Sequence, residues 1–207
     1  MRRPNGYIRL LVVLNLAMIA ICIRHYAEPY DLRAYPISSL GGTETMNGYP
    51  NRSSALRFVA GMAASSSISF RYGTAYHAAG LPLASTVRTI SRLASAGFLV
   101  TALPHNIPAL WRPHGIGAAA VFVGFWAITL LQLRSLAERF GPVLQAALGA
   151  LLTVPLASYA LLIAAGSPLE HAAQKFAVLG LVLTTLRVSH EMELQSLPAT
   201  AGEPRWA

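Results

Sequence analysis

Apolar residues gather in six long runs along this chain of 207 residues, and the charged residues fall mostly between the runs. The runs approach 20 residues, the length that an α-helix needs to cross about 30 Å of hydrocarbon at about 1.5 Å per residue. They lack the polar and apolar alternation of membrane β-strands, and backbone without internal hydrogen bonds cannot face lipid. The pattern therefore predicts an all-α, polytopic transmembrane bundle of six helices. The predicted spans are residues 7–23, 54–70, 85–103, 114–133, 142–164 and 168–186.

The first run follows the charged start MRRPNG, as the core of a secretory signal peptide does. The residues after it, RHYAEP, contain no small-x-small cleavage site, and five more apolar runs follow. We therefore interpret the first run as an uncleaved span. Residues 1–6 then form a cytoplasmic N-terminus, residues 7–186 the six-helix domain, and residues 187–207 a cytoplasmic C-terminal tail. From Glu191 onward we expect this tail to be disordered and exposed.

The basic residues predict the orientation, because Lys and Arg are enriched near the cytoplasmic ends of spans. With the N-terminus inside, ten arginines lie on the inner side and five on the outer side, which favours an N-in, C-in topology. We expect a multi-pass protein of a bacterial plasma (inner) membrane. The inner arginines are Arg2, Arg3, Arg9, Arg71, Arg88, Arg92, Arg134, Arg139, Arg187 and Arg205, and the outer ones are Arg24, Arg33, Arg52, Arg57 and Arg112.

Composition agrees with a membrane protein and excludes other classes. Only 12% of the residues are charged, against about 25% in ordinary soluble domains, and 54% are hydrophobic. The net charge of +8 comes from basic residues spread singly or in pairs at the ends of apolar runs, so we predict no nucleic-acid binding. A single cysteine, Cys22, excludes intramolecular disulfides and thiolate zinc sites, and we interpret it as a small apolar residue.

Small residues at four-residue spacing predict close helix contacts, because apolar burial gains little between helices already surrounded by lipid. Pro155, in the middle of the fifth run, predicts a kink. Ser167 and Glu170 have the spacing of a capping box, with Pro168 at the first helical position, and predict the start of the sixth helix. The small-residue pairs are Gly61 with Ser65, Gly115 with Ala119, and Ala146 with Ala150.

Two polar connections meet at the outer surface on this topology. Residues 24–53 form the only long connection, and residues 101–117, TALPHNIPALWRPHGIG, join the third and fourth spans. A hairpin turn explains most of the second segment, because its prolines break helices and its tryptophan suits a membrane interface. The turn does not explain His105 and His114, which the topology brings to the level of the long loop and the start of the sixth span.

Three kinds of site stay open at this outer level. A serine of the long loop, Ser38 or Ser39, could form a hydrolytic triad with a histidine and Glu170. The histidines and carboxylates could bind a metal, but no zinc-helix spacing is present, and we predict neither a metal nor a cofactor such as haem. We favour a third interpretation, in which these residues hydrogen-bond the loops to helix ends and meet lipid head groups. The candidate metal ligands are His105, His114, His171, Glu170 and Asp31.

Lys175 lies about two turns inside the sixth run, where a cation costs at least a few kcal/mol unless it is paired or reaches the interface. Glu170 and His171 lie one turn outward, and Arg57 enters the second run from the same side. We therefore predict a partly buried polar cluster, which could pin the outer loop to the bundle.

Three segments resemble a known family: PISSLGG (36–42), NGYPNRSSALRFVAGM (47–62) and SAGFLVTALPHNIPALWRPHGIGA (95–118). They are similar to bacterial six-span membrane proteins grouped as domain-of-unknown-function family 998. More distantly, the pattern resembles the eukaryotic Frag/DRAM/Sfk family, which is linked to membrane-lipid organisation and autophagy. The resemblance covers roughly residues 7–186 and implies a membrane role without an assigned reaction.

The resemblance marks Ser38, Gly41, Pro104 and His114 as family residues. One feature departs from the family pattern, since no acidic residue follows the proline of the third-to-fourth turn. His105 and Asn106 stand there instead. This departure argues against a carboxylate–histidine metal pair in the turn.

Together these features favour a non-enzymatic protein that organises membrane or lipid through an outer-face polar cluster. Its expected partners are membrane lipids, and a membrane protein or a second copy of the chain would be a further partner class. Two alternatives stay open: a membrane-embedded enzyme or redox protein that uses the outer histidines, and a small transporter. The predicted cluster comprises Ser38, Gly41, His105, Asn106, Arg112, His114, Glu170, His171 and Lys175.

Overall fold

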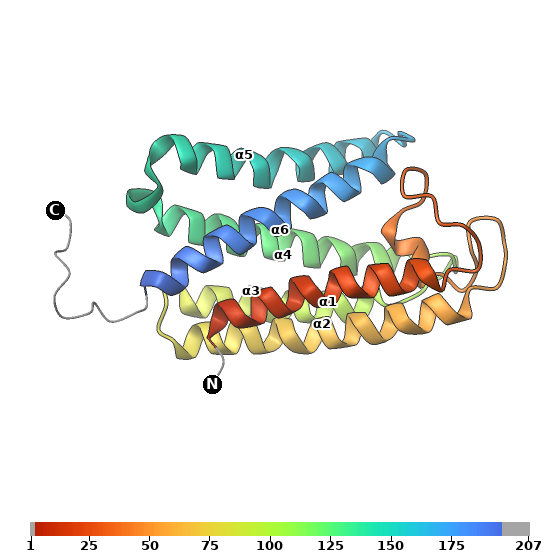
Figure 1. The fold of residues 1–207 in the computed structure, drawn as a ribbon, viewed down its shortest axis with the longest axis horizontal. Coiled ribbons are helices and arrows are strands. Elements are labelled where there is room, and N and C mark those ends of the chain that lie inside the picture. The colour runs from red at the N-terminus through yellow and green to blue at the C-terminus, as the bar shows by residue number, and fades with distance from the viewer. Residues whose placement is uncertain (1–2, 196–207) are drawn as a thin grey trace.

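The computed structural model describes residues 3–195, which form six α-helices and one short 3-10 helix (Figure 1). Successive α-helices run in opposite directions, so α1 begins and α6 ends at the same end of the bundle (Figure 1). The all-α prediction of six helices is confirmed, and each predicted span falls on one of them. The elements are α1 (Pro4–Arg24), η1 (Ile37–Gly41), α2 (Arg52–Ala78), α3 (Ala84–Thr101), α4 (Trp111–Ser135), α5 (Ala137–Ala164) and α6 (Glu170–Gln195).

Three of the described helices, α1, α4 and α5, are long and apolar enough to cross a membrane. Polar residues make α2 and α3 less apolar, but many of these residues turn inward. The Ser66 and Ser95 hydroxyls lie 2.9 Å apart between α2 and α3, and the Ser69 hydroxyl donates to the Ser91 carbonyl at 3.0 Å. All four serines are buried, so their polarity serves helix contacts rather than contact with the surroundings.

Small residues allow close helix approach at some of the predicted positions and not at others. A Cβ on Gly61 would collide with Met18 of α1, as predicted for a contact position. In α4 the close contact is made by Gly117, where a Cβ would lie 2.7 Å from the Thr101 nitrogen of α3. The prediction for Gly115 with Ala119 is wrong, because a Cβ on Gly115 would meet nothing within 4 Å. The Ala146 and Ala150 pair of α5 is exposed rather than packed.

The two ends of α6 differ from the prediction. The Ser167 side chain caps the turn before the helix by accepting from the Leu169 nitrogen at 3.3 Å, and the helix itself begins at Glu170. At its other end α6 continues to Gln195, so the expectation of a disordered tail from Glu191 is wrong for Glu191–Gln195. Glu191 is buried there, with its carboxylate 2.7 Å from Arg139 of α5 and 2.6 Å from Arg187. Residues 196–207 of the expected tail lie outside the described residues.

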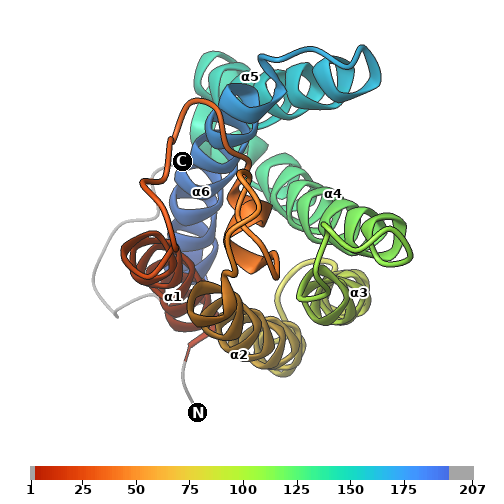
Figure 2. The ribbon, with the colours of Figure 1, turned by 90° about the vertical axis from the view of Figure 1, so that its right-hand side faces the viewer.

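Helices α5 and α6 pair with each other, and α6 runs diagonally across the bundle (Figure 1). Viewed from the end that carries the long loop, η1 lies inside the ring formed by α1, α2, α3, α4 and α6 (Figure 2). The short helix therefore covers one end of the space enclosed between the long helices.

Candidate functional site

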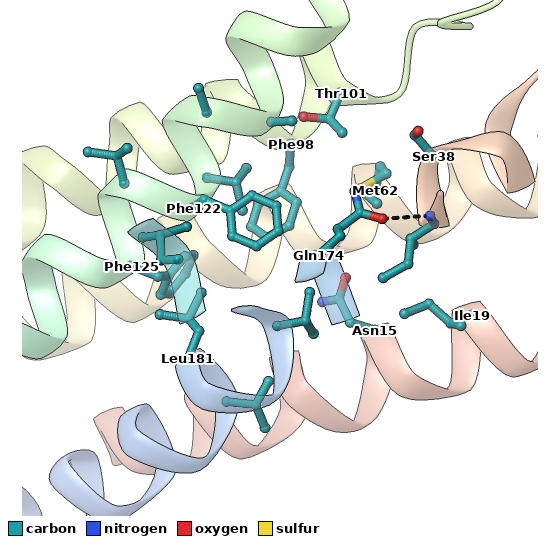
Figure 3. A pocket seen from close by; sticks show the side chains of 18 of the residues that line it. Asn15, Ile19, Ser38, Met62, Phe98, Thr101, Phe122, Phe125, Gln174 and Leu181 are labelled. Carbon is teal, nitrogen blue, oxygen red and sulfur yellow. Dashed lines mark hydrogen bonds between the residues drawn. The ribbon is translucent and has the colours of Figure 1, made fainter. Parts of the chain in front are cut away.

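A cavity of about 550 Å³ lies between the long helices, and η1 closes its end nearest the long loop. Its walls are mainly aliphatic and aromatic. Phe98, Phe122, Phe125 and Leu181 gather at one end in Figure 3, while the labelled polar side chains, Asn15, Ser38, Thr101 and Gln174, lie toward η1. The polar or hydroxyl-bearing lining residues are Asn15, Ser38, Thr101, His114, Tyr159, Gln174 and Thr185.

The start of α2 fixes η1 in place. The Ser54 hydroxyl donates to the Leu40 carbonyl at 2.8 Å, and the Asn51 amide donates to the Gly42 carbonyl at 3.1 Å. Gly41 packs directly on the Phe58 ring, where a Cβ would collide. Close packing therefore requires a glycine at position 41, one of the positions that the predicted resemblance marks.

Helix α6 holds η1 from the opposite side. The Ile37 backbone nitrogen donates to the Gln174 side-chain oxygen at 2.8 Å, the bond drawn in Figure 3, and the Gln174 amide donates to the Tyr159 hydroxyl at 3.0 Å. Lys175 donates to the Tyr35 carbonyl. The prediction that Lys175 pins the loop to the bundle agrees with this contact, although its partner is a backbone carbonyl and not Glu170.

Sequence reasoning missed Gln174 and Asn51, which hold η1 on α6 and on α2. Gln174 stands in an ordinary helical run and has no motif around it. Asn51 begins the sequence NRS, which matches a glycosylation pattern, yet its side chain is buried and serves the backbone of η1. No sequence pattern distinguishes either residue, because Gln174 lies within α6 and Asn51 directly precedes α2 without a motif that reports its contact with η1.

The long loop is itself ordered by aromatic contacts. The Tyr30 and Tyr35 rings meet edge to face at 5.6 Å, and Tyr26 meets Tyr30 in the same way at 5.2 Å. The Tyr30 hydroxyl donates to the Pro36 carbonyl at 2.8 Å, immediately before η1. Burial raises the pKa of Tyr30 to about 12, so this hydroxyl stays protonated and keeps its hydrogen bond at ordinary pH.

The two histidines of the α3–α4 turn lie together beside the cavity. The His105 and His114 rings are 5.6 Å apart, and His114 Nδ1 lies 2.8 Å from the Leu103 carbonyl, which fits an Nδ1–H tautomer. His105 Nδ1 is buried without a partner among the described residues. Burial, reinforced by His114 and opposed by hydrogen bonding to the Ser38 backbone, lowers the pKa of His105 to about 4. The lowered pKa favours an uncharged ring at His105.

The remaining predicted residues do not join one cluster. Glu170 and His171 pair with each other, with Oε1 and Nδ1 3.6 Å apart, and neither lines the cavity. Arg112 is exposed and lies over the Trp111 ring at 5.5 Å. Arg57 donates to the Ser53 carbonyl at 2.8 Å on its own helix. Its guanidinium therefore does not join Lys175 in the predicted polar cluster.

The side chains considered as metal ligands or as a hydrolytic triad do not come together either. Within residues 3–195, no three His, Cys, Asp or Glu side chains lie close enough to hold a metal ion. The Ser39 hydroxyl donates to the Pro36 carbonyl at 2.8 Å, which leaves Ser38 as the serine that faces the cavity. Asn106 instead serves the loop, because its amide bonds to Thr43.

No protein family, no curated protein and no solved structure matches this chain. The resemblance to family 998 stays a prediction.

Proposed function

We propose that this chain is a six-span, N-in/C-in protein of the bacterial plasma membrane that binds and organises lipid without catalysing a reaction. The observation that carries the proposal is the distribution of large apolar side chains, which are exposed on all six helices. Exposed apolar surface of this extent favours a lipid surrounding over water. Examples, one from each helix in order, are Val13, Leu56, Leu93, Ile116, Val154 and Leu179.

The burial pattern supports membrane spans in α2, α3 and α6 as well. These helices have 27, 18 and 26 residues, which correspond to about 40, 27 and 39 Å at about 1.5 Å per residue. Part of their polarity is buried, as at Ser65, Ser91 and Thr184, and Leu56, Leu93 and Phe176 are among the side chains that face outward. A hydropathy average over the whole helix therefore understates how apolar the outer surface is.

The basic residues at the end opposite η1 support the proposed orientation. Arg71, Arg88 and Arg134 lie near the helix ends opposite η1, and Arg139 and Arg187 lie at that same end in contact with buried Glu191. Basic residues are favoured on the cytoplasmic side. The long loop, η1 and the α3–α4 turn would then face outward.

The ordered outer cap supports a lipid role rather than a catalytic one. Several polar side chains at this end hold the loop: Asn106 contacts Thr43, Gln174 contacts Ile37, and Lys175 contacts Tyr35. Such a cap fixes the shape of the outer end and closes the apolar cavity beneath it. We infer that membrane lipids are the partners of this protein.

Thiol labelling tests the topology. A Cys22→Ser background carries single cysteines at exposed Ala109, in the α3–α4 turn, or at exposed Ala79, at the end of α2. We expect a membrane-impermeant maleimide to label Ala109→Cys in intact cells and Ala79→Cys only after permeabilisation. Labelling in the reverse order, or release of the protein by alkaline carbonate, would contradict the proposal.

Lipid analysis tests the function. Protein purified by mild detergent and returned to native lipid should carry lipid at fixed stoichiometry and leave the lipid composition unchanged on prolonged incubation. Chemical conversion of any lipid class, lost in His105→Ala, would favour a membrane-embedded enzyme. That second candidate rests on the buried Nδ1 of His105, which has no partner among the described residues, and on the free Ser38 hydroxyl that lines the cavity.

A further inference from the structure

We infer that the cavity beneath η1 is a binding site for one membrane lipid with a hydrocarbon chain and an uncharged head that bears hydroxyl or carbonyl groups. The inference deepens the proposed function and rests on the membrane location. At about 550 Å³ the cavity falls in the range of about 300–1,000 Å³ that is typical of small-molecule sites.

The polarity of the walls matches an amphiphile held with its head toward the outer surface. Ser38 and Gln174 lie at the η1 end, while Phe125 and Leu181 lie at the far end (Figure 3). The site is therefore polar at the end that the proposed topology places outside, and apolar toward the middle of the membrane. A lipid of the outer leaflet has this same polarity.

Hydrogen-bonding capacity remains available at the polar end. The Ser38 hydroxyl makes no hydrogen bond to any other described residue and faces the cavity. Tyr159 accepts from Gln174 and keeps its own hydroxyl proton for a ligand. Asn15 uses its amide nitrogen toward Leu11 and Ser65, which leaves its carbonyl oxygen as an acceptor. A head group that bears hydroxyl and carbonyl groups can accept hydrogen bonds from Ser38 and Tyr159 and donate one to the Asn15 carbonyl.

The lining contains no Asp, Glu, Lys or Arg among the residues described. Lys175, one residue after Gln174, is bound to the Tyr35 carbonyl, and Arg112 faces outward over Trp111. A phosphate inside the cavity would therefore lie in an apolar site without a cation, which is strongly unfavourable. This is the reason for an uncharged head.

The cavity also reaches the surface that the proposal places against lipid. Leu16 of α1, Val123 of α4 and Ile163 of α5 line the cavity and are nevertheless 55%, 54% and 48% exposed. A lipid can therefore enter sideways from the bilayer, without passing through the cap that η1 forms.

Photo-crosslinking in nanodiscs tests this inference with the full-length chain. The probes are a diacylglycerol and a phosphatidylglycerol that carry the same diazirine in one acyl chain. We expect the diacylglycerol to label cavity-lining peptides of α1, α4 and α6. The phosphatidylglycerol should label only outward-facing positions. Cavity labelling by phosphatidylglycerol at the level of diacylglycerol would overturn the inference.

Gly115→Trp fills the cavity, because Gly115 lines it and has open space beside it. Ile116→Trp is the matched control, since Ile116 is 70% exposed and lies outside the lining. Cavity labelling should be lost in the first variant and retained in the second. Ala160→Phe fills the same space from α5 if Gly115→Trp fails to fold. Equal labelling of filled and control variants would overturn the inference.

Failed labelling in a protein with the proposed topology would refute this site alone, whereas a contradicted topology would refute both proposals.

Discussion

The side chain of Asn106 makes two hydrogen bonds to Thr43, across 63 positions of the chain. The Thr43 backbone nitrogen donates to Asn106 Oδ1 at 3.0 Å, and Asn106 Nδ2 lies 2.9 Å from the Thr43 hydroxyl. This pair joins the α3–α4 turn to the long loop directly after η1. It explains why an asparagine follows His105 in a turn that otherwise needs only helix-breaking residues.

Replacing Asn106 tests this connection. Asn106→Ala removes both hydrogen bonds and should cost about 1–2 kcal/mol of unfolding free energy, at about 1 kcal/mol for each exposed bond. Hydrogen exchange should quicken in the loop around Thr43. Asn106→Asp is the control, because a carboxylate can accept from both the nitrogen and the hydroxyl of Thr43. If the aspartate variant behaves like the alanine variant, the pair does not fix the loop.

Gln174 should matter more than its neighbours in α6. Gln174→Leu leaves the Ile37 N–H without its acceptor, and an unsatisfied buried donor costs about 1–3 kcal/mol. Tyr159→Phe removes only the hydroxyl that Gln174 contacts and should cost less, about 0.5–1.5 kcal/mol. Thermal unfolding in detergent measures both. A larger loss in Tyr159→Phe than in Gln174→Leu would show that η1 does not depend on this bond.

Gly41 and Gly115 should respond in opposite directions to alanine. Gly41→Ala places a methyl group against the Phe58 ring, and such overpacking costs about 1–3 kcal/mol. Gly115→Ala adds a methyl in open space within a helix and should stabilise the protein by about 0.5–1 kcal/mol. The same unfolding assay compares them. A neutral Gly41→Ala would mean that η1 can move away from α2.

His105 should make the protein sensitive to acid. Its pKa falls from 6.5 to about 4 on folding, so the unfolded chain binds more protons than the folded chain between those values. The stability that His105 contributes is therefore complete above about pH 6.5 and is lost as the pH falls toward 4. His105→Gln should flatten this part of a plot of unfolding free energy against pH. An unchanged slope would show that His105 is hydrated and not buried beside His114.

Helix number and position were predictable because long apolar runs have few alternatives in a membrane protein. The end of α6 was not predictable, because Val188, Glu191 and Met192 are buried by contacts with other helices, such as that of Glu191 with Arg139 of α5, and no local pattern reports such contacts. The sequence indicates that Lys175 needs a partner. It does not identify that partner, because the group is the backbone carbonyl of Tyr35 and not a side chain. The sequence brought His105 and His114 to one level, and the structure places them side by side.

The cavity itself was beyond sequence reasoning. It depends on how far α5 and α6 stand from α1 and α4, and this spacing is set by many side chains together. Gly115 illustrates the difficulty, because its spacing with Ala119 predicted a helix contact and the structure shows open space beside it. Of the small residues in α4, Gly117 contacts α3, whereas Gly115 lines the cavity.

A density map of the full-length protein in lipid nanodiscs tests the central claim most directly. We expect the bilayer to surround all six helices, with η1 and the α3–α4 turn at one surface. An elongated density should lie between α1, α4 and α6 and end near Ser38. Helices that lie outside the bilayer, or a cavity closed by inward movement of α5 and α6, would contradict the account.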